Sequence, residues 1–323
     1  RLAPGCGAGL VSARDDAGNT CSDRPVVDYG GNSVGGFVGT TGWSVSGLWM
    51  QGPGTQTGFE GAFNVAGSDG LVIHRVRVTA ASGSTVKIAG TPASRLAVWG
   101  STLEMSPNGD ETGSNMFWAG ERLVVMNSLI DNHEKAEFNM RFMGARNVLL
   151  SDSEWQRPGF QSMRNAIQIR GTDPETTASG WAVLRRNLFV SHGNSFAPFL
   201  RFCRDAGCHN DGPNGFSSME NIIVESNHMR YDRPSIETPH FGLVTIQAGE
   251  VTVRNNTIDL RGQVSTNLDA VLCNVPDEPR GGGSYDNVHC FNNTIFSSDA
   301  SATGVTLCSA QVGSGHRCYN NLV

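Results

Sequence analysis

Residues 131–171 read DNHEKAEFNMRFMGARNVLLSDSEWQRPGFQSMRNAIQIRG, and this stretch decides the fold. Two segments inside it have the same form, FNMRFMG at residues 138–144 and NAIQIRG at residues 165–171. Each segment alternates apolar and polar residues and then ends in glycine. Because successive side chains of a β-strand point to opposite faces of a sheet, an alternation of period two predicts a strand. The stretch therefore contains two strands of one repeating design.

Segments of this form recur outside the stretch. Further copies are TVKIAG (85–90), NMFWAG (115–120), PFLRFC (198–203) and GLVTIQ (242–247). Aligning the copies produces two columns of positions that we expect to face outward. The first column holds Lys87, Phe117, Arg141, Gln168, Arg201 and Thr245. The second column holds Ala89, Ala119, Met143, Arg170, Cys203 and Gln247.

A second recurring unit has an apolar triplet, a short polar segment and an apolar pair. Its copies are LVVMNSLI (123–130), VLLSDSEW (148–155), AVLRRNLF (182–189), IIVESNHM (222–229), VTVRNNTI (251–258) and VHCFNNTI (288–295). This unit alternates with the glycine-ended strand at a period of roughly 25 to 40 residues, which is typical of repeat architectures. Three short strands per coil predict an all-β protein, a right-handed parallel β-helix of about ten coils. We expect residues 1–41 to form an irregular N-terminal cap and residues 42–323 to form the β-helix domain.

The turn of the second unit aligns small polar residues in one column. These residues are Ser128, Ser153, Asn187, Asn227, Asn256, Asn293 and Asn321. Stacked Asn and Ser side chains can hydrogen-bond along the helix axis and satisfy one another's amide groups. The column therefore predicts a ladder inside the turn.

Composition excludes some classes of function and favours others. The net charge of −6 disfavours nucleic acid as a partner. No apolar run approaches the roughly 20 residues that a helix needs to span a bilayer, so we expect no membrane span. The eight cysteines fall into neighbouring couples: Cys6 and Cys21, Cys203 and Cys208, Cys273 and Cys290, Cys308 and Cys318. This pattern predicts local disulfides and an extracytoplasmic location, either secreted or periplasmic, whereas zinc is disfavoured because no Cys-x-x-Cys pair exists.

Over residues 42–323, the coil periodicity and the asparagine column resemble the pectate-lyase-like β-helix superfamily. The resemblance specifies the fold and implies activity on carbohydrate. A shared theme of Lys, Arg and Glu also resembles the alginate-lyase and chondroitinase-type polysaccharide lyases, although their motif order is not reproduced here. The sequence motifs that are typical of polygalacturonases do not occur in register in this chain.

Cationic residues concentrate in the outward columns. Arg141, Arg170 and Arg201 lie on three consecutive coils, and neighbouring coils are about 4.8 Å apart. Long insertions, which build groove walls on solenoids, occupy residues 171–180, 204–218, 230–240 and 276–285. We therefore expect a groove that binds an anionic polymer through bidentate arginine contacts. The alternative is a structural ion-pair ladder, whose acidic members would be Glu137, Asp152, Glu154 and Asp173.

The turn HEKAE (133–137) leads into the strand that carries Arg141. In β-helix polysaccharide lyases, a Lys or Arg takes the proton beside a uronate carboxylate, and a cation or Ca²⁺ neutralises that carboxylate. The resemblance therefore implies Lys135 as the base, with His192 in reserve. The predicted catalytic residues are Lys135, Arg141, Arg170 and His192. The predicted substrate-binding residues are Arg164, Arg201, Arg204, Gln168 and His240, and Glu134 and Glu137 are the predicted ligands of a Ca²⁺ ion.

These observations favour a secreted polysaccharide lyase that cleaves an acidic, uronate-containing polysaccharide by β-elimination. Two alternatives stay open, because fold alone does not separate them. One is a glycoside hydrolase, which needs two carboxylates about 5 to 9.5 Å apart in the same groove. The acidic residues available to it are Glu134, Glu137, Asp152, Glu154 and Asp173. The other alternative is a non-catalytic β-helix that binds glycans or belongs to a surface assembly.

Overall fold

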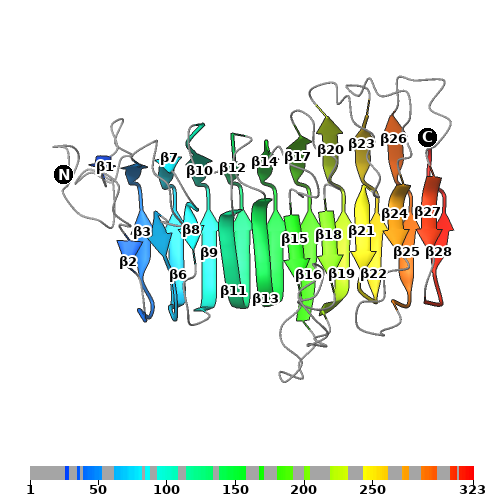
Figure 1. Cartoon of the computed structure of the whole chain (residues 1–323), viewed down its shortest axis with the longest axis horizontal. Helices are drawn as coiled ribbons and strands as arrows, with labels where there is room; N and C mark the ends of the chain where they lie inside the picture. The colour runs from blue at the N-terminus through cyan, green and yellow to red at the C-terminus, as the bar shows by residue number, and fades with distance from the viewer. Residues whose placement is uncertain are drawn as a thin grey trace, which may run out of the picture.

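The computed structural model describes most of the repeating part of the chain. The described residues are 26–28, 35–36, 39–52, 62–81, 84–87, 93–107, 114–133, 138–157, 167–170, 180–191, 200–203, 219–231, 243–260, 271–275, 285–296, 306–310 and 313–323. They form an elongated stack of parallel strands that advances from the N-terminal to the C-terminal end (Figure 1). The predicted right-handed parallel β-helix is thereby confirmed.

Three ladders of parallel strands run along the axis of the stack. Sheet 1 contains β1 (Val26–Asp28), β4 (Trp49–Gln51), β7 (Arg77–Ala81), β10 (Thr102–Met105), β12 (Leu129–Asp131), β14 (Glu154–Gln156), β17 (Leu188–Ser191), β20 (His228–Tyr231), β23 (Thr257–Asp259) and β26 (Thr294–Phe296). Sheet 2 contains β2 (Gly35–Gly36), β5 (Phe63–Asn64), β8 (Val86–Lys87), β15 (Ile167–Arg170), β18 (Leu200–Cys203), β21 (Val244–Gln247), β24 (Val271–Val275) and β27 (Thr306–Ala310). Sheet 3 contains β3 (Ser44–Ser46), β6 (Asp69–His74), β9 (Ala93–Trp99), β16 (Gly180–Arg185), β19 (Met219–Glu225), β22 (Val251–Arg254), β25 (Val288–Phe291) and β28 (Arg317–Tyr319).

Two long strands, β11 (Ser114–Met126) and β13 (Phe138–Ser151), join sheets 2 and 3. Their first halves pair with β8 and β15 in sheet 2, and their second halves pair with β9 and β16 in sheet 3. Their mutual register shifts between Trp118 and Gly120, at the boundary between the two sheets. From β2 onward the chain visits sheet 2, sheet 3 and sheet 1 in turn, so each circuit makes one coil.

The division between cap and helix at residues 41 and 42 stays a prediction. Within the range assigned to the cap, β1 pairs with β4 and β2 pairs with β5, both in parallel register. These two strands therefore continue the ladders of sheets 1 and 2 before residue 42. In the described part of the chain, no helix is long and apolar enough to span a membrane.

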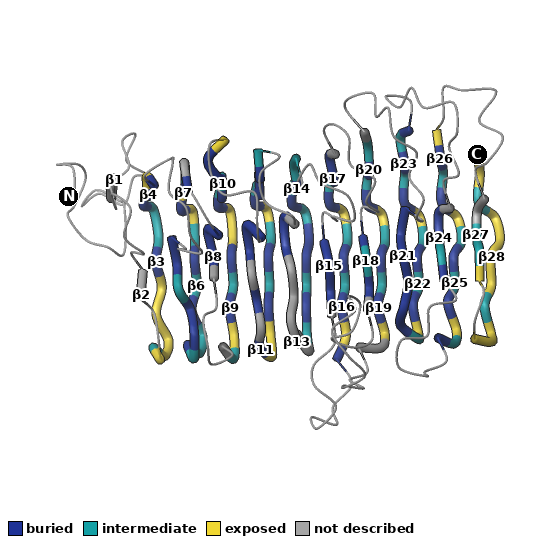
Figure 2. The backbone as a smooth tube through the Cα atoms, in the orientation of Figure 1, coloured by how far each residue is buried: buried dark blue, intermediate teal, exposed yellow. Residues whose placement is uncertain are grey.

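The core lies inside the coils and follows from the alternation of the strands. In the apolar triplets the outer two residues are buried and the middle one is partly exposed, as for Leu123, Val124 and Val125. Figure 2 shows this alternation along the strands. The largest buried side chains include Trp155 and Phe189, which stack on adjacent coils with ring centroids 6.4 Å apart. Continuous burial along the axis supplies the hydrophobic stabilisation that no single coil could provide.

The turn from sheet 3 to sheet 1 has two residues and repeats from coil to coil. Its first residue adopts a positive φ, for example 48° at Asn127, 50° at Arg186 and 55° at Asn255. Its second residue is Leu48 and Val76 on the first two coils, and from Ser128 onward it is the small polar residue of the predicted column. Because this second side chain points into the turn, the members of the column on neighbouring coils can hydrogen-bond directly to one another.

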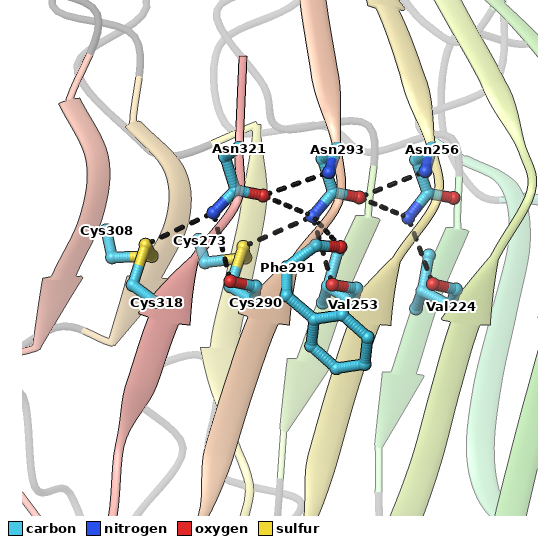
Figure 3. Close-up of a disulfide and its surroundings, with 10 residues drawn as sticks. All are labelled: Val224, Val253, Asn256, Cys273, Cys290, Phe291, Asn293, Cys308, Cys318 and Asn321. Carbon is cyan, nitrogen blue, oxygen red and sulfur yellow. Dashed lines mark hydrogen bonds between the residues drawn. A yellow bond between two sulfur atoms is a disulfide. The ribbon is translucent and has the colours of Figure 1, made fainter.

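The predicted ladder is confirmed. The backbone N–H and the side-chain Nδ2 of Asn227 both donate to Oδ1 of Asn256, each at 2.9 Å. Asn256 donates in the same way to Asn293, and Asn293 to Asn321 (Figure 3). Serine fills the same place on earlier coils, where the backbone N–H of Ser128 donates to another serine hydroxyl oxygen at 3.2 Å. The ladder therefore satisfies buried amides through hydrogen bonds between neighbouring coils.

Two of the predicted disulfides are present among the described residues. Cys273 of β24 bonds to Cys290 of β25, and Cys308 of β27 bonds to Cys318 of β28. Each bridge joins sheet 2 to sheet 3 within one coil, across the connection between the two strands, as the sequence predicted. Cys6, Cys21, Cys208 and the side chain of Cys203 lie outside the described residues.

The long insertions cluster around one sheet. Residues 171–179, 204–218 and 276–287 connect sheet 2 to sheet 3, and residues 232–243 connect sheet 1 to sheet 2. Every one of these connections therefore begins or ends at sheet 2. The turn from sheet 3 to sheet 1, by contrast, stays at two residues, so sheet 2 is the face with the most additional chain at its edges.

Candidate functional site

The strand register of sheet 2 confirms the first column of the sequence alignment. Lys87 pairs with Phe117, Phe117 with Arg141, Arg141 with Gln168, Gln168 with Arg201, and Arg201 with Thr245. We call this set of positions row 1, which also includes Asn64, Asn274 and Ser309. Row 2, two residues further along each strand, contains Met143, Arg170, Cys203 and Gln247.

The three arginines are on consecutive coils but do not form one line. Arg141 and Arg201 share row 1 and are separated by Gln168, so their positions are two coils, or about 9.6 Å, apart. Arg170 stands in row 2, between Met143 and Cys203. The cationic positions therefore alternate across two rows. Rows 1 and 2 together contain no Asp or Glu.

The middle of these rows is more buried than the sequence predicted. Gln168, expected to face an open groove, is fully buried, and Thr245 and Gln247 are 4% and 6% exposed. Arg201 is partly exposed, and its Nε and Nη2 donate to Oε1 of Gln247 at 3.4 and 3.2 Å. The amide of Gln247 thus orients the guanidinium of Arg201 at the edge of a buried polar floor.

On other faces of the helix, arginines pair with acids of the adjacent coil. Arg95 binds Asp69 through Nε at 2.6 Å and Nη2 at 2.8 Å. Arg254 binds Glu225 at 2.9 and 2.6 Å. These pairs are bidentate or nearly so, and they lie in register between neighbouring strands. Ion pairs of this kind, between neighbouring coils, are what a structural ion-pair ladder around Arg141, Arg170 and Arg201 would have required.

Two acids assigned to that alternative belong to a different face. Asp152 lies in the turn from sheet 3 to sheet 1, where it accepts from Arg186 Nε at 2.7 Å and Nη2 at 2.8 Å. The Arg186 guanidinium, with a hydrogen bond from Ser151, lowers the pKa of Asp152 to about 2. Glu154 on sheet 1 accepts a hydrogen bond from Gln156. These two acids therefore do not form an ion-pair ladder with the sheet 2 arginines, whereas Glu137 and Asp173, the other acids of that alternative, lie outside the described residues.

A shallow hollow of about 620 Å³ crosses the same turn. Its lining includes Gly100, Thr102, Leu129, Asp152 and Glu154. Asp152 is held ionised by its arginine partner, so it cannot donate a proton as a general acid at ordinary pH. The hollow therefore holds two carboxylates, of which Asp152 could act only as a base or nucleophile.

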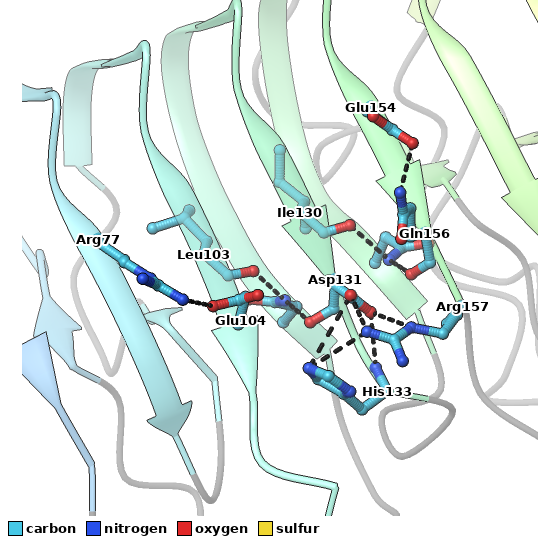
Figure 4. Close-up of polar contacts among 11 residues, drawn as sticks. Arg77, Leu103, Glu104, Ile130, Asp131, His133, Glu154, Gln156 and Arg157 are labelled. Carbon is cyan, nitrogen blue, oxygen red and sulfur yellow. Dashed lines mark hydrogen bonds and ion pairs between the residues drawn. The ribbon is translucent and has the colours of Figure 1, made fainter.

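A second polar cluster occupies the outer face of sheet 1, and the sequence analysis did not predict it (Figure 4). Asp131 is buried at the end of β12, and its Oδ1 accepts from Arg157 Nε at 2.7 Å and from the backbone N–H of His133 at 2.9 Å. A second bond joins Arg157 Nη2 to Asp131 Oδ2. Arg157 also contacts His133 Nε2 at 3.3 Å, and Glu104 stands in register with Asp131 on the next strand. One feature of the sequence could have revealed this contact. Arg157 directly follows Gln156, which pairs with Asp131 in the register of sheet 1.

The donors of this cluster do not suit a metal ion, although ligand atoms of Glu104, Asp131 and His133 lie within 4.8 Å of one another. Both oxygens of Asp131 already accept from the guanidinium of Arg157, which would repel a cation at the same point. For the same reason Asp131 is a poor nucleophile. The cluster instead ties down the chain at residues 131–133, where it leaves sheet 1.

Several predicted site residues lie outside the described part of the chain. These are Glu134, Lys135, Glu137, Arg164, His192, Arg204 and His240. For Arg141 and Arg170 the strand positions are described but the side chains are not. The predicted Ca²⁺ ligands and the predicted base therefore stay predictions. Gln168 and Arg201 are the two predicted residues whose side chains are described.

No family model matches the chain, and no curated protein is similar to it in sequence. The pectate-lyase-like superfamily therefore stays a resemblance in coil pattern. The parallel β-helix and the disulfides fit a secreted carbohydrate-active protein.

Proposed function

We propose that this extracytoplasmic protein binds an acidic polysaccharide along sheet 2 and cleaves it by β-elimination. The observation that carries the proposal is the composition of rows 1 and 2. They place Lys87, Arg141, Arg170 and Arg201 on one sheet, among neutral residues and without Asp or Glu. On a chain of net charge −6, such a face complements a polyanion.

The geometry of the rows supports a chain lying along the helix axis. Arg141 and Arg201 stand about 9.6 Å apart in row 1, and Arg170 is offset between them. A polymer with a carboxylate on successive sugar units could meet these positions in turn. Bidentate guanidinium contacts suit carboxylate groups. The hydrogen bonds from Arg201 to Gln247 orient one of these guanidinium groups before any ligand arrives.

In the proposed reaction, a base removes the proton next to the uronate carboxylate, a carbon–carbon double bond forms as the bond to the leaving sugar oxygen breaks, and that oxygen takes up a proton. Negative charge builds up on the carboxylate in the transition state, so a neighbouring cation stabilises that state more than the ground state. We assign this role to Arg141 and Arg170. Lys135 is the proposed base and His192 the reserve, and Glu134 and Glu137 are the proposed ligands if Ca²⁺ takes part.

The state of Asp152 supports elimination over hydrolysis at the one hollow that carries two carboxylates. Asp152 is ionised and bound to Arg186, so it cannot serve as the acid that hydrolysis requires. Elimination needs a base and a cation but no carboxylic acid, which matches the residue types of sheet 2.

The first experiment measures binding to polyuronates of different linkage, such as polygalacturonate and alginate, at several salt concentrations. Arg201→Ala should weaken binding, and the loss should be larger at low salt because charge attraction is then least screened. The matched control is Arg254→Ala, which removes an arginine that is paired with Glu225 on sheet 3. Equal losses of affinity in the two variants, or no binding by the wild type, would contradict the proposed binding face.

The second experiment follows unsaturated products by ultraviolet absorbance with the same polymers. Lys135→Ala should abolish turnover and leave binding nearly intact, because a base acts on the barrier rather than on the bound state. Reducing sugar released without an unsaturated product would identify a hydrolase. Normal turnover by the Lys135 variant would show that Lys135 is not the base, and His192 would then be replaced next.

A further inference from the structure

The hollow on the turn from sheet 3 to sheet 1 has no part in the proposed cleavage. It has a volume of about 620 Å³ and follows the turn over the four coils from β9 to β17 (Figure 1). Four coils are separated by three spacings, so the hollow extends about 14 Å along the helix axis. The proposed cleavage face is sheet 2, and a ligand in the hollow would therefore leave that face free.

A missing side chain opens one end of the hollow. The first residue of the turn is Arg75, Gly100, Asn127, Asp152 and Arg186 on successive coils, each with a positive φ. Gly100 thus leaves a gap between the side chains of Arg75 and Asn127. A Cβ added at Gly100 would lie 3.7 Å from Cγ of Arg75, which is an ordinary van der Waals contact. A side chain would therefore fit at this position, and its absence leaves space for a ligand.

The outward row of sheet 1 forms the second side of the hollow. Strand register places Thr102 beside Leu129, Leu129 beside Glu154, and Glu154 beside Leu188. All four side chains line the hollow and are partly exposed. Apolar and polar side chains therefore alternate along it, so a ligand meets both kinds of contact at each end.

The ion pair of Asp152 and Arg186 gives the hollow a fixed polar wall. Nε and Nη2 of Arg186 donate to the two carboxylate oxygens at 2.7 and 2.8 Å, and Nη2 lies 3.3 Å from the hydroxyl of Ser151. A guanidinium has five N–H donors and a carboxylate oxygen accepts more than one bond, so the pair retains capacity for a ligand. Side chains already held in one orientation lose little entropy when they bind it.

The charges of the lining disfavour a uronate in this hollow. Arg186 is the only cationic residue of the lining among the described residues, and it is already paired with Asp152. Glu154 adds a further negative charge, which would repel a carboxylate ligand. A neutral sugar meets no such repulsion. Its hydroxyl groups can both donate and accept, and the leucine side chains offer contact to its C–H groups.

An exposed tryptophan stands at the N-terminal end of the hollow. Trp99 directly precedes Gly100, and 53% of its surface is exposed. His74 on the preceding coil packs against its ring, with the ring centroids 5.1 Å apart. A supported aromatic ring with an exposed surface is a platform on which a sugar ring stacks.

We propose that this hollow is a second glycan site, which binds a neutral oligosaccharide along the helix axis with one sugar ring stacked on Trp99. The site goes beyond the proposed cleavage and does not depend on it. Sheet 2 and the hollow lie on different parts of each coil, so an acidic chain and a neutral chain can be bound at the same time.

The test uses isothermal titration calorimetry of the full chain with neutral hexasaccharides of glucose, xylose, mannose and galactose. At least one should bind, with an affinity that changes little with salt because no ligand charge is involved. Gly100→Asn fills the open end of the hollow and should weaken binding at least about tenfold. Trp99→Ala removes the platform and should weaken binding about five- to tenfold.

Ser226→Asn is the matched control, because it introduces the same side chain into the same turn position on a coil beyond the hollow. Asparagine already adopts a positive φ at this position, 48° at Asn127 and 55° at Asn255, so both variants should keep the wild-type urea midpoint. Both are made in a bacterial host, because asparagine at position 100 would precede Ser101 and Thr102 and create a glycosylation signal.

Arg201→Ala separates this site from the cleavage face, and it should bind the neutral hexasaccharide as the wild type does. The proposal is overturned if no hexasaccharide binds the wild type, or if Gly100→Asn binds as tightly as Ser226→Asn. It is also overturned if Arg201→Ala loses the neutral ligand, which would place that ligand on sheet 2. Loss of polyuronate binding alone would contradict the cleavage face and leave this site standing.

Discussion

Replacing Asn256 in the middle of the ladder tests the stabilisation of the whole stack. Its side chain makes four hydrogen bonds in the structure. Its Oδ1 accepts from the backbone N–H and from Nδ2 of Asn227, and its Nδ2 donates to Oδ1 of Asn293 and to the carbonyl of Val224. The residue is buried, so water cannot replace these bonds. Asn256→Ala therefore leaves the buried N–H of Asn227 without its acceptor.

The expected magnitude follows from that orphaned donor. An unsatisfied buried donor costs about 1–3 kcal/mol, and each further lost hydrogen bond costs about 0.5–1.5 kcal/mol. Part of the loss is recovered, because Nδ2 of Asn227 keeps its bond to the carbonyl of Leu184 at 2.9 Å. We expect Asn256→Ala to lower the free energy of unfolding by about 3 kcal/mol.

Asn256→Ser distinguishes a lost hydrogen bond from a lost volume. Ser153 occupies the same ladder position and accepts the backbone N–H of Ser128 at 3.2 Å. A serine at position 256 should accept from Asn227 in the same way, and we expect it to cost about half as much as alanine. Asn255→Gly is the control, because this neighbouring asparagine is exposed and has a φ of 55°, which glycine tolerates.

The assays are urea unfolding and hydrogen exchange of the peptide that contains Asn227. Exchange is the sharper measurement, because long repeat arrays can depart from two-state unfolding. Protection of the Asn227 amide should fall in the alanine variant and be largely kept in the serine variant. Equal destabilisation by alanine and serine would refute the reasoning, since the cavity rather than the orphaned donor would then decide the cost.

Two further perturbations test the ion pairs. The pKa of Asp152 is about 2 in the folded chain and 3.8 ordinarily, so its pair with Arg186 adds stability above about pH 4 that is lost as pH falls toward 2. The urea midpoint of unfolding should therefore fall less across this pH range in Asp152→Asn than in wild type. Parallel curves for the two proteins would contradict the assignment. Arg157→Met leaves Asp131 buried without its counter-ion and should cost about 3–5 kcal/mol in urea unfolding. Arg77→Met, at a pair in which the arginine is 47% exposed, should cost no more than about 1 kcal/mol, and equal costs would show that burial does not set the value of these pairs.

Much of the candidate site was predictable because its pattern is local. The alignment of FNMRFMG, NAIQIRG and PFLRFC placed Arg141, Gln168 and Arg201 in one column, and the strand register agrees. This works because a period of two assigns each residue to a face, and glycine marks the same point in four of the six copies. What the pattern could not supply was burial, since Gln168 is fully buried although it alternates as an outward residue.

The cluster around Asp131 shows why other parts were missed. Asp131 and Arg157 lie 26 residues apart, and each looks like an ordinary charged turn residue in the sequence. They meet because β12 and β14 are adjacent in sheet 1, so the contact depends on the exact number of residues in one coil. Coil length varies along this chain, and a pairing between coils cannot be read before the register is known.

The sequence by itself determined the architecture, the ladder and the two local disulfides that the structure describes. Those features repeat, and repetition reveals them because each coil must bury the same face and satisfy the same turn amides. The tertiary structure alone decided which charges meet, as for Asp152 with Arg186 and Asp131 with Arg157. Such contacts join different coils, and they act over only a few ångströms. Their existence therefore depends on the register between coils, which no single segment of the sequence encodes.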